Sequence, residues 1–114
     1  MVGKFELSKS KNGKFMFNLK AGNGQIILTS QLYDAKKDAS DGIASCKKNA
    51  AVDERFVRAV STSGQPYFNL KAGNGQVIGR SEMYSSEASR ANGIASVKTN
   101  APGADIKDLT EPQA

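Results

Sequence analysis

The stretch NLKAGNGQ occurs twice in the chain without a change, at residues 18–25 and again at residues 69–76. Each copy lies between two short apolar runs, and its Gly-Asn-Gly centre is typical of a tight hairpin, because glycine and asparagine tolerate positive φ. A phosphate-binding loop would instead be followed at once by a helix. Both copies are followed by a strand pattern, so the sequence favours a turn over an anion-binding loop.

The two copies belong to a longer tandem repeat. A shift of 51 residues aligns residues 4–54 with residues 55–105 without a gap, and 22 of the 51 positions are identical. A unit repeated at this period is one that needs its neighbour to bury its apolar face. We therefore expect a single domain spanning residues 1–114, made of two repeats at about 4–54 and 55–110 and ending in a flexible tail at 111–114.

Each repeat begins with strand patterns. Phe15, Phe17 and Leu19 alternate with Met16, Asn18 and Lys20, which is the period of a half-buried strand. Strands are predicted at residues 4–8, 14–20 and 25–29, at 55–60, 65–71 and 76–80, and in the final segment ADIKDLT at 104–110.

A helical pattern closes each repeat. The predicted buried stripes are Tyr84, Ala88, Ala91, Ile94 and Ala95 in the second copy and Tyr33, Ala35, Ala39, Ile43 and Ala44 in the first. Asp34 and Ser85 are the predicted N-caps. Each helix also contains a glycine, Gly42 or Gly93, which costs about 0.5–1 kcal/mol relative to alanine and so indicates a close approach of helix and sheet.

These elements predict an α+β fold: two β-β-β-α-β repeats that form a single antiparallel sheet with both helices on one face. The segments YFNLKAGNGQVIGRSEMYSS and GIASVKTNAP resemble the YegP-like family of small, uncharacterised bacterial proteins, and the resemblance covers nearly the whole chain. It implies that the C-terminal strands are exchanged between the repeats, and that the segment at residues 51–54 crosses to the other repeat. It implies no activity, cofactor or binding residue.

Several classes of site are excluded by composition. With one cysteine and no histidine, the chain can form neither an intramolecular disulfide, nor a Cys/His zinc site, nor a histidine-based triad. Cys46 aligns with Val97, which favours a small buried hydrophobe over a nucleophile. The acids Asp34, Asp38 and Asp41 align with Ser85, Ser89 and Asn92, so the repeat preserves no carboxylate pair. We therefore expect that the protein is not an enzyme and that it has no catalytic, cofactor-binding or metal-binding residues.

A binding face is predicted on the sheet. If Phe17 and Leu19 face the helices, the opposite, helix-free side presents Met16, Asn18, Lys20, Tyr67, Asn69 and Lys71. Such a face suits a binding module for a protein or peptide, although an ordinary solvated face is the plainer interpretation. Nucleic acid is the second partner class, through this face and the lysines Lys9, Lys11 and Lys14. Tyr67 is its only aromatic residue, whereas sheets that bind single strands present several.

Charge and hydropathy set the remaining expectations. The net charge is +5, of which residues 1–53 contribute 9 − 5 = +4 and residues 54–114 contribute 7 − 6 = +1. The simplest explanation of the excess positive charge in the first half is that it keeps the protein soluble. No apolar run approaches the roughly 20 residues of a membrane helix, and the first residues lack the apolar stretch of a secretory signal. We expect a cytoplasmic monomer without membrane contact.

Overall fold

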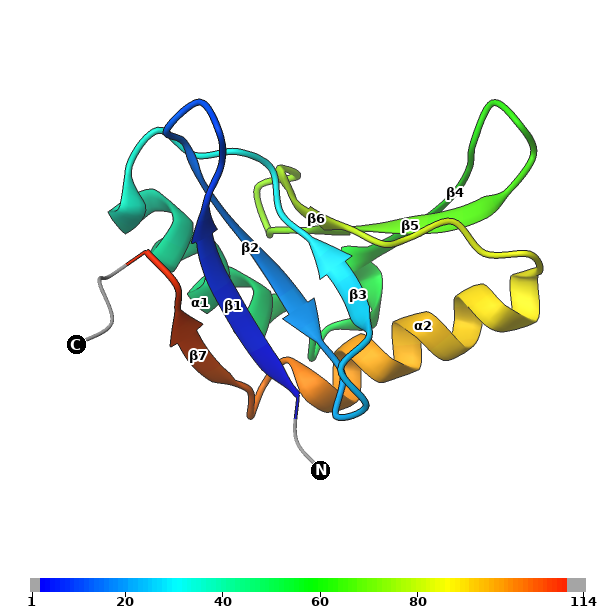
Figure 1. Cartoon of the computed structure of the whole chain (residues 1–114). Helices are drawn as coiled ribbons and strands as arrows, with labels where there is room; N and C mark the ends of the chain where they lie inside the picture. Colours follow the sequence, from blue (N-terminus) through cyan, green and yellow to red (C-terminus); the bar gives the residue numbers. More distant parts are fainter. Residues whose placement is uncertain (1–2, 111–114) are drawn as a thin grey trace.

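One mixed sheet forms the body of the molecule in the computed structural model, which describes residues 3–110 (Figure 1). The strands are β1 (Lys4–Lys9), β2 (Phe15–Lys20), β3 (Ile26–Thr29), β4 (Phe56–Val60), β5 (Pro66–Lys71), β6 (Val77–Arg80) and β7 (Asp105–Asp108). The helices are α1 (Lys36–Asn49), α2 (Glu87–Asn100) and the 3-10 turn η1 (Asp53–Arg55). The strand order is β4-β5-β6-β3-β2-β1-β7. The expected tail at 111–114 lies outside the described residues.

The repeated Gly-Asn-Gly segments are turns, as the sequence predicted. In the first, the amide of Gly24 donates to the carbonyl of Ala21, and the amide of Ala21 donates to the carbonyl of Gln25. Only the glycine has positive φ, 86° at Gly24, while Asn23 accepts a 3.0 Å hydrogen bond from the Gln25 amide through its side chain. The second copy repeats these contacts. The asparagine therefore stabilises the turn through its side-chain hydrogen bond, and its own backbone has a negative φ.

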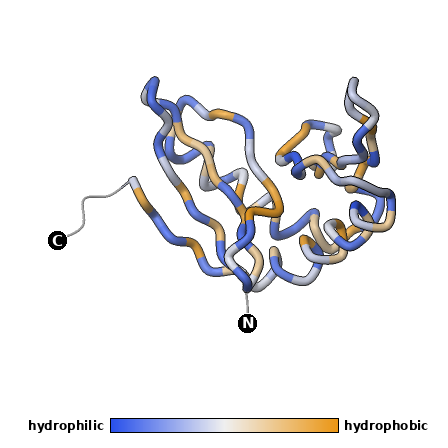
Figure 2. The backbone as a smooth tube through the Cα atoms, turned by 45° about the vertical axis from the view of Figure 1, so that its right-hand side comes forward, coloured by the Kyte–Doolittle hydropathy of each residue, from blue (hydrophilic) through white to orange (hydrophobic). Residues whose placement is uncertain are grey.

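A single apolar core lies between the sheet and the two helices. Alternation along β2 and β5 buries Phe17, Leu19, Phe68 and Leu70 completely, and Figure 2 shows the same alternation of polar and apolar residues along the strands. Each buried phenylalanine stacks on the tyrosine that precedes the helix: Phe17 on Tyr33 and Phe68 on Tyr84, both with ring centroids 6.3 Å apart. The predicted α+β fold, with both helices on one face, is confirmed.

The helices bury only part of the predicted stripes: Ala39, Ile43 and Ile94 are buried, and Tyr33 and Tyr84 pack against the core, but the other alanines do not. In α2, Ala88, Ala91 and Ala95 are exposed, and Ala35 and Ala44 of the first copy are exposed too. The buried residues of α2 are Arg90, Gly93, Ile94, Val97 and Asn100. The prediction was wrong for these exposed alanines because small apolar residues were taken as the buried ones, whereas Gly42 and Gly93 make the closest contact with the tyrosine and phenylalanine rings of the core.

The predicted N-caps are also displaced. Helix α1 begins after Ala35, which makes no capping bond through its side chain, and Ser86 caps α2 by accepting from the Ser89 amide. Asp34 instead pairs with Lys14. The predicted cap Ser85 lies one residue before Ser86, the observed N-cap of α2.

Strand β7 carries the exchange between the repeats. It leaves the second repeat and runs parallel to β1 of the first, with Phe5 opposite Ile106 and Leu7 opposite Asp108. The expectation of a wholly antiparallel sheet was therefore wrong at this one pair, because the connection through α2 returns the chain in the same direction as β1. An ion pair between Lys36 and Asp108, 2.6 Å long, and hydrogen bonds from Thr110 lower the pKa of Asp108 to about 2.

The first repeat has no equivalent of β7. Residues 51–54 were expected to cross to the other repeat, but Asp53–Arg55 forms η1 and the chain enters β4 at Phe56. The connection is too short for a crossing: η1 ends at Arg55 and β4 begins at Phe56, so no linker remains that would let residues 51–54 reach the other repeat. Contacts with the neighbouring helices hold it, including the ion pair of Asp53 with Lys98 and the bond from Arg55 to Asn49.

Candidate functional site

A continuous row of outward side chains crosses the helix-free face of the sheet. The strand registers place its seven members next to one another, in the order Val57, Asn69, Arg80, Thr29, Asn18, Glu6 and Lys107. They alternate with buried neighbours such as Phe5 and Leu70, so they point away from the helices. The row includes the predicted residues Asn18 and Asn69.

All six predicted residues lie on this face and are partly exposed: Met16, Asn18, Lys20, Tyr67, Asn69 and Lys71. They form two groups, one in each repeat, separated by β3 and β6. In the first group, Asn18 accepts a 2.8 Å hydrogen bond from Thr29, and Lys20 pairs with Glu6 at 3.0 Å.

The second group differs from the first. Arg80 lies over the ring of Tyr67, 5.6 Å from its centroid, and reaches Asn69 at 3.5 Å. Glu6 aligns with Val57, so Lys71 lacks the acidic neighbour that Lys20 has. Within residues 3–110, the side chain of Lys71 forms no ion pair or hydrogen bond. Lys71 of the second repeat is therefore more available to a partner than Lys20 of the first, while Arg80 is held by Tyr67 and Asn69.

The two repeats meet at a local twofold axis. Thr29 and Arg80 occupy equivalent positions and are also paired with each other, so the axis passes between them. A hollow of about 400 Å³ opens here on the helix-free face. Its lining includes the equivalent pairs Ile26 with Val77, Thr29 with Arg80, Ser30 with Ser81, and Gln31 with Glu82. The hollow is thus lined by both apolar and polar side chains.

Sequence reasoning missed the residues around this axis. Ile26 and Val77 are 44% and 38% exposed, and with Arg80 they stand between the two predicted groups. Their positions follow from the pairing of β3 with β6, which no single-strand pattern reveals. The repeat did contain a signal, because a twofold axis that relates two units passes between equivalent residues of those units.

The face carries a positive charge. The register and alternation of the strands place Lys4, Lys20, Lys71, Arg80 and Lys107 on it, with Glu6 and Asp105 as the acids among them. Glu82 stands at the rim of the hollow. An anionic or acidic surface would be attracted to this side of the sheet.

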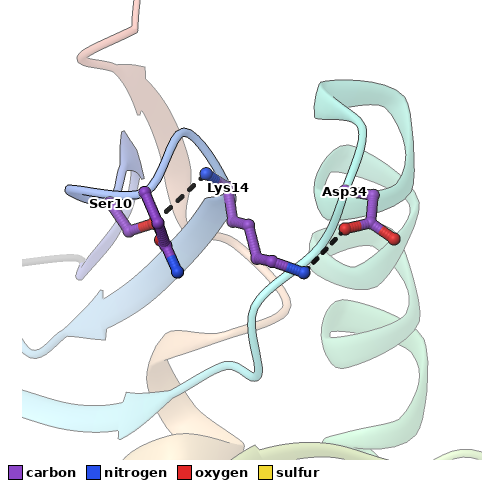
Figure 3. A network of polar contacts seen from close by, with 4 residues as sticks. Ser10, Lys14 and Asp34 are labelled. Atoms are coloured by element: carbon purple, nitrogen blue, oxygen red, sulfur yellow. Dashed lines mark hydrogen bonds and ion pairs between the residues drawn. The ribbon is translucent and has the colours of Figure 1, made fainter.

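The lysines of the first hairpin are largely engaged elsewhere. Lys14 extends away from its own hairpin to Asp34, 2.8 Å away, as Figure 3 shows. Its backbone amide bonds the hydroxyl of Ser10. Lys9 lies over the ring of Phe15, 5.6 Å from the centroid. Lys11 is exposed. The three lysines therefore do not form one cationic loop.

Other duplicated polar residues serve the fold. Ser30 and Ser81 each accept a 2.9 Å bond from a strand amide, of Phe17 and Phe68, and donate to the next carbonyl. Asn49 and Asn100 bond the carbonyls of Ser45 and Ser96 within their own helices. Their duplication is explained by structure alone.

Cys46 is fully buried in the core, and burial raises the pKa of its thiol to about 12. Since the thiolate is the reactive form, we expect no reaction with a thiol reagent such as Ellman's reagent until the protein is unfolded. A Cys46→Val variant should change the free energy of unfolding by less than about 1.5 kcal/mol, because valine occupies the equivalent position 97. Rapid labelling of the folded protein would contradict this prediction.

Comparison with known proteins places the chain in a family. The model of a domain of unknown function, DUF1508, matches residues 10–56 and 61–108. The chain belongs to this family. A UPF0339 protein of Acinetobacter baylyi is 56% identical over 110 residues, covering 96% of this chain and 99% of that protein. The UPF0339 protein YegP of Escherichia coli K12 is 52% identical, covering 96% of this chain and 100% of that protein.

Two solved members of the family share the fold. The solution NMR structure of a UPF0339 protein from Shewanella oneidensis is 54% identical, with a TM-score of 0.91, and the match covers 96% of this chain and 93% of that one. The solution NMR structure of yegP from E. coli, described as a protein of unknown function, is 50% identical, with a TM-score of 0.92, covering 99% and 97%. The family thus confirms the architecture and carries no established activity.

Proposed function

We propose that the protein is a non-enzymatic binding module that holds an acidic surface of a protein or peptide partner on its helix-free sheet face. The observation that carries this proposal is the row of outward side chains that runs over all seven strands and passes the hollow at the local axis. Apolar residues in the hollow supply contact area, and the surrounding cations supply charge complementarity.

The side chains on this face favour binding over catalysis. Among the described residues, no group of three or more Cys, Asp or Glu side chains could hold a metal ion. The thiol of Cys46 is buried away from the face. The face offers amide, hydroxyl, ammonium, guanidinium and aliphatic groups, with fewer carboxylates, and the strands that carry them give a rigid support for recognition.

We further propose that the module acts as a monomer in the cytoplasm. The exchange of β7 is completed within one chain, so the fold needs no second copy. A single buried cysteine suits a reducing compartment. Among the described helices, none has the length and apolar character to cross a membrane.

Nucleic acid is the second candidate partner, favoured by the lysines and Arg80 of the face. Against it stands the scarcity of stacking platforms: Tyr67 is the aromatic residue on this side, and Arg80 already covers its ring. The engagement of Lys14 and Lys9 also removes most of the basic hairpin from such a role.

A matched pair of charge reversals tests the proposal. Lys71→Glu/Arg80→Glu changes the helix-free face, and Lys37→Glu/Lys48→Glu makes the same change in net charge on exposed positions of α1. Proteins captured from extract by wild type should also be captured by the α1 variant. Capture by the sheet variant should fall at least tenfold, with a loss of about 1.4 kcal/mol or more.

Two further measurements complete this test. Capture should weaken with rising salt, because exposed charges are screened. Equal capture by both variants would refute the sheet face as the binding surface. Amide shifts at Lys20, Tyr67 and Lys71 on addition of a short single-stranded oligonucleotide, together with loss of the captured proteins after nuclease treatment, would favour nucleic acid instead.

A further inference from the structure

The two repeats differ at the outer edges of the sheet. Strand β1, the first strand of repeat one, is covered by β7, while β4, the equivalent strand of repeat two, forms the end of the sheet. Figure 1 shows β7 beside β1 and β4 at the opposite side of the sheet. Within residues 3–110, no strand pairs with the outer side of β4. Because β4 is the equivalent of β1, the pairing of β7 with β1 indicates how a strand would pair with the outer side of β4.

The backbone of β4 is oriented to receive a strand. In β1, the carbonyl of Leu7 points outward and accepts a 2.8 Å bond from the amide of Leu109, just beyond β7. Arg58 is the equivalent of Leu7, so its amide and carbonyl also point away from β5. The amide of Phe56 is already bonded to Asp53, which places the open positions at Arg58 and Val60. An open edge of this kind is a template for strand addition.

The side chains next to β4 fit a carboxylate. At the edge of β1, Asp108 lies opposite Leu7 and pairs with Lys36 of α1. At the edge of β4, the position of Leu7 is taken by Arg58. Residues Lys36 and Ala39 correspond to Glu87 and Arg90. Two arginines and one glutamate thus give this corner a net positive charge, as Lys36 alone does at the first edge.

Arg90 is the unusual group at this corner. It is 7% exposed, although its equivalent in α1 is alanine. Its guanidinium donates to the carbonyl of Ala59 on β4 at 2.9 Å and lies 3.4 Å from Glu87. Its Nε has no hydrogen-bond partner among the described residues. A buried guanidinium that is not fully paired raises the local affinity for an anion.

We propose that β4 is a docking edge for an extended, acidic segment of a partner protein, which runs parallel to β4 as β7 runs along β1. The register follows from β7: a carboxylate lies opposite Arg58, on the side of α2. The residue before it lies opposite Val57, on the helix-free face, and is apolar because Val57 stands where β1 has Glu6. Main-chain hydrogen bonds supply affinity, and these two side chains supply selectivity.

A second copy of the chain fits this edge poorly. An antiparallel pair of β4 strands centred on Arg58 would set the two arginines opposite each other, and like charges directly opposite are destabilising. The other natural occupant, β7, is already paired with β1. This inference does not depend on the proposed function, because it concerns the edge of the sheet and not its face.

The test uses the full-length protein and a peptide of known sequence. The probe is the segment 104–110 with Lys107→Val, and the control peptide carries Asp108→Lys in addition. On titration of the ¹⁵N-labelled protein with the probe, the largest amide shifts are expected at Arg58 and Val60. The control peptide should bind at least tenfold more weakly.

Protein variants sharpen the result. Arg58→Glu should weaken probe binding at least tenfold, whereas Lys11→Glu, an equal change of charge on the exposed first hairpin, should leave it unchanged. The proposal is overturned if the shifts are absent from β4, or unaffected by Arg58→Glu. Shifts that fall at Lys71 and Arg80 would support only the sheet face, and shifts in β1 would indicate displacement of β7. Shifts of β4 with protein concentration alone would identify a second copy as the occupant.

Discussion

Expressed separately, residues 1–54 and 55–114 are expected to remain unfolded, and to fold when they are mixed in equimolar amounts. Each half is too short to bury a large core by itself. The first half leaves the outer edge of β1 uncovered, because β7 belongs to the second half. The second half has β7 but lacks the strand that it pairs with. Each half therefore exposes what the other covers.

Contacts at the local axis should make the complex of the two different halves more stable than a dimer of either half. Leu28 fills the core at the axis and is 1% exposed, and its equivalent is Gly79. A Cβ atom at Gly79 would lie 2.6 Å from Leu28 Cδ2, so one leucine and one glycine fit together. A dimer of first halves would be overpacked by two leucines at the axis. A dimer of second halves would have a cavity there and would place two Arg80 side chains opposite each other.

Circular dichroism and heteronuclear NMR of the separate and mixed halves check this prediction. The mixture should give the spectrum of the intact chain, and analytical ultracentrifugation should show one copy of each half. A folded monomer of either half, with dispersed amide resonances, would refute the mutual completion of the repeats. The Gly79→Leu variant of the second half serves as the control, since it should fail to assemble with the first half.

The sequence was most informative where a pattern is local. The alternation of Phe17 and Leu19 with polar neighbours identified β2 and its two faces, and the Asn-Gly pairs located the turns. The repeat then required two similar units. The exchange of β7 came from family resemblance, because a strand that pairs with a partner 101 residues away leaves no periodic signal in its own four residues.

The sequence was least informative where the repeats depart from symmetry. Arg90 occupies a buried helical position where charge is not expected, because the edge beside it lacks a counterpart of β7. Gly79 occupies a strand because Leu28 needs its space. The hollow depends on the pairing of Thr29 with Arg80, a contact between repeats. These features arise from how the units fit together, which cannot be derived from either unit alone.

Substitution of alanine for Gly93 is expected to destabilise the protein, although alanine favours a helix by about 1 kcal/mol over glycine. The added Cβ would collide with the hydroxyl of Tyr84, would lie 2.5 Å from Tyr84 Cζ and would approach Phe68 Cε1 to 3.2 Å. Phe68 is fully buried, and Tyr84 is stacked on it, so neither ring can move away freely. Overpacking of this kind costs about 1–3 kcal/mol, which exceeds the gain in helix propensity.

The sign of this effect should depend on Tyr84. In a Tyr84→Ala background the collision is removed, and Gly93→Ala should then stabilise the protein by about 0.5–1 kcal/mol relative to that background. Asn92→Ala, at an exposed position of the same helix, reports the propensity gain without any change in packing. Urea denaturation of the four proteins of the cycle and of this control gives each free energy of unfolding. If Gly93→Ala stabilises the wild-type protein as it does the Tyr84→Ala variant, the tyrosine ring is not what requires glycine in the helix, and the contact between α2 and the sheet must be looser than the stacked rings imply.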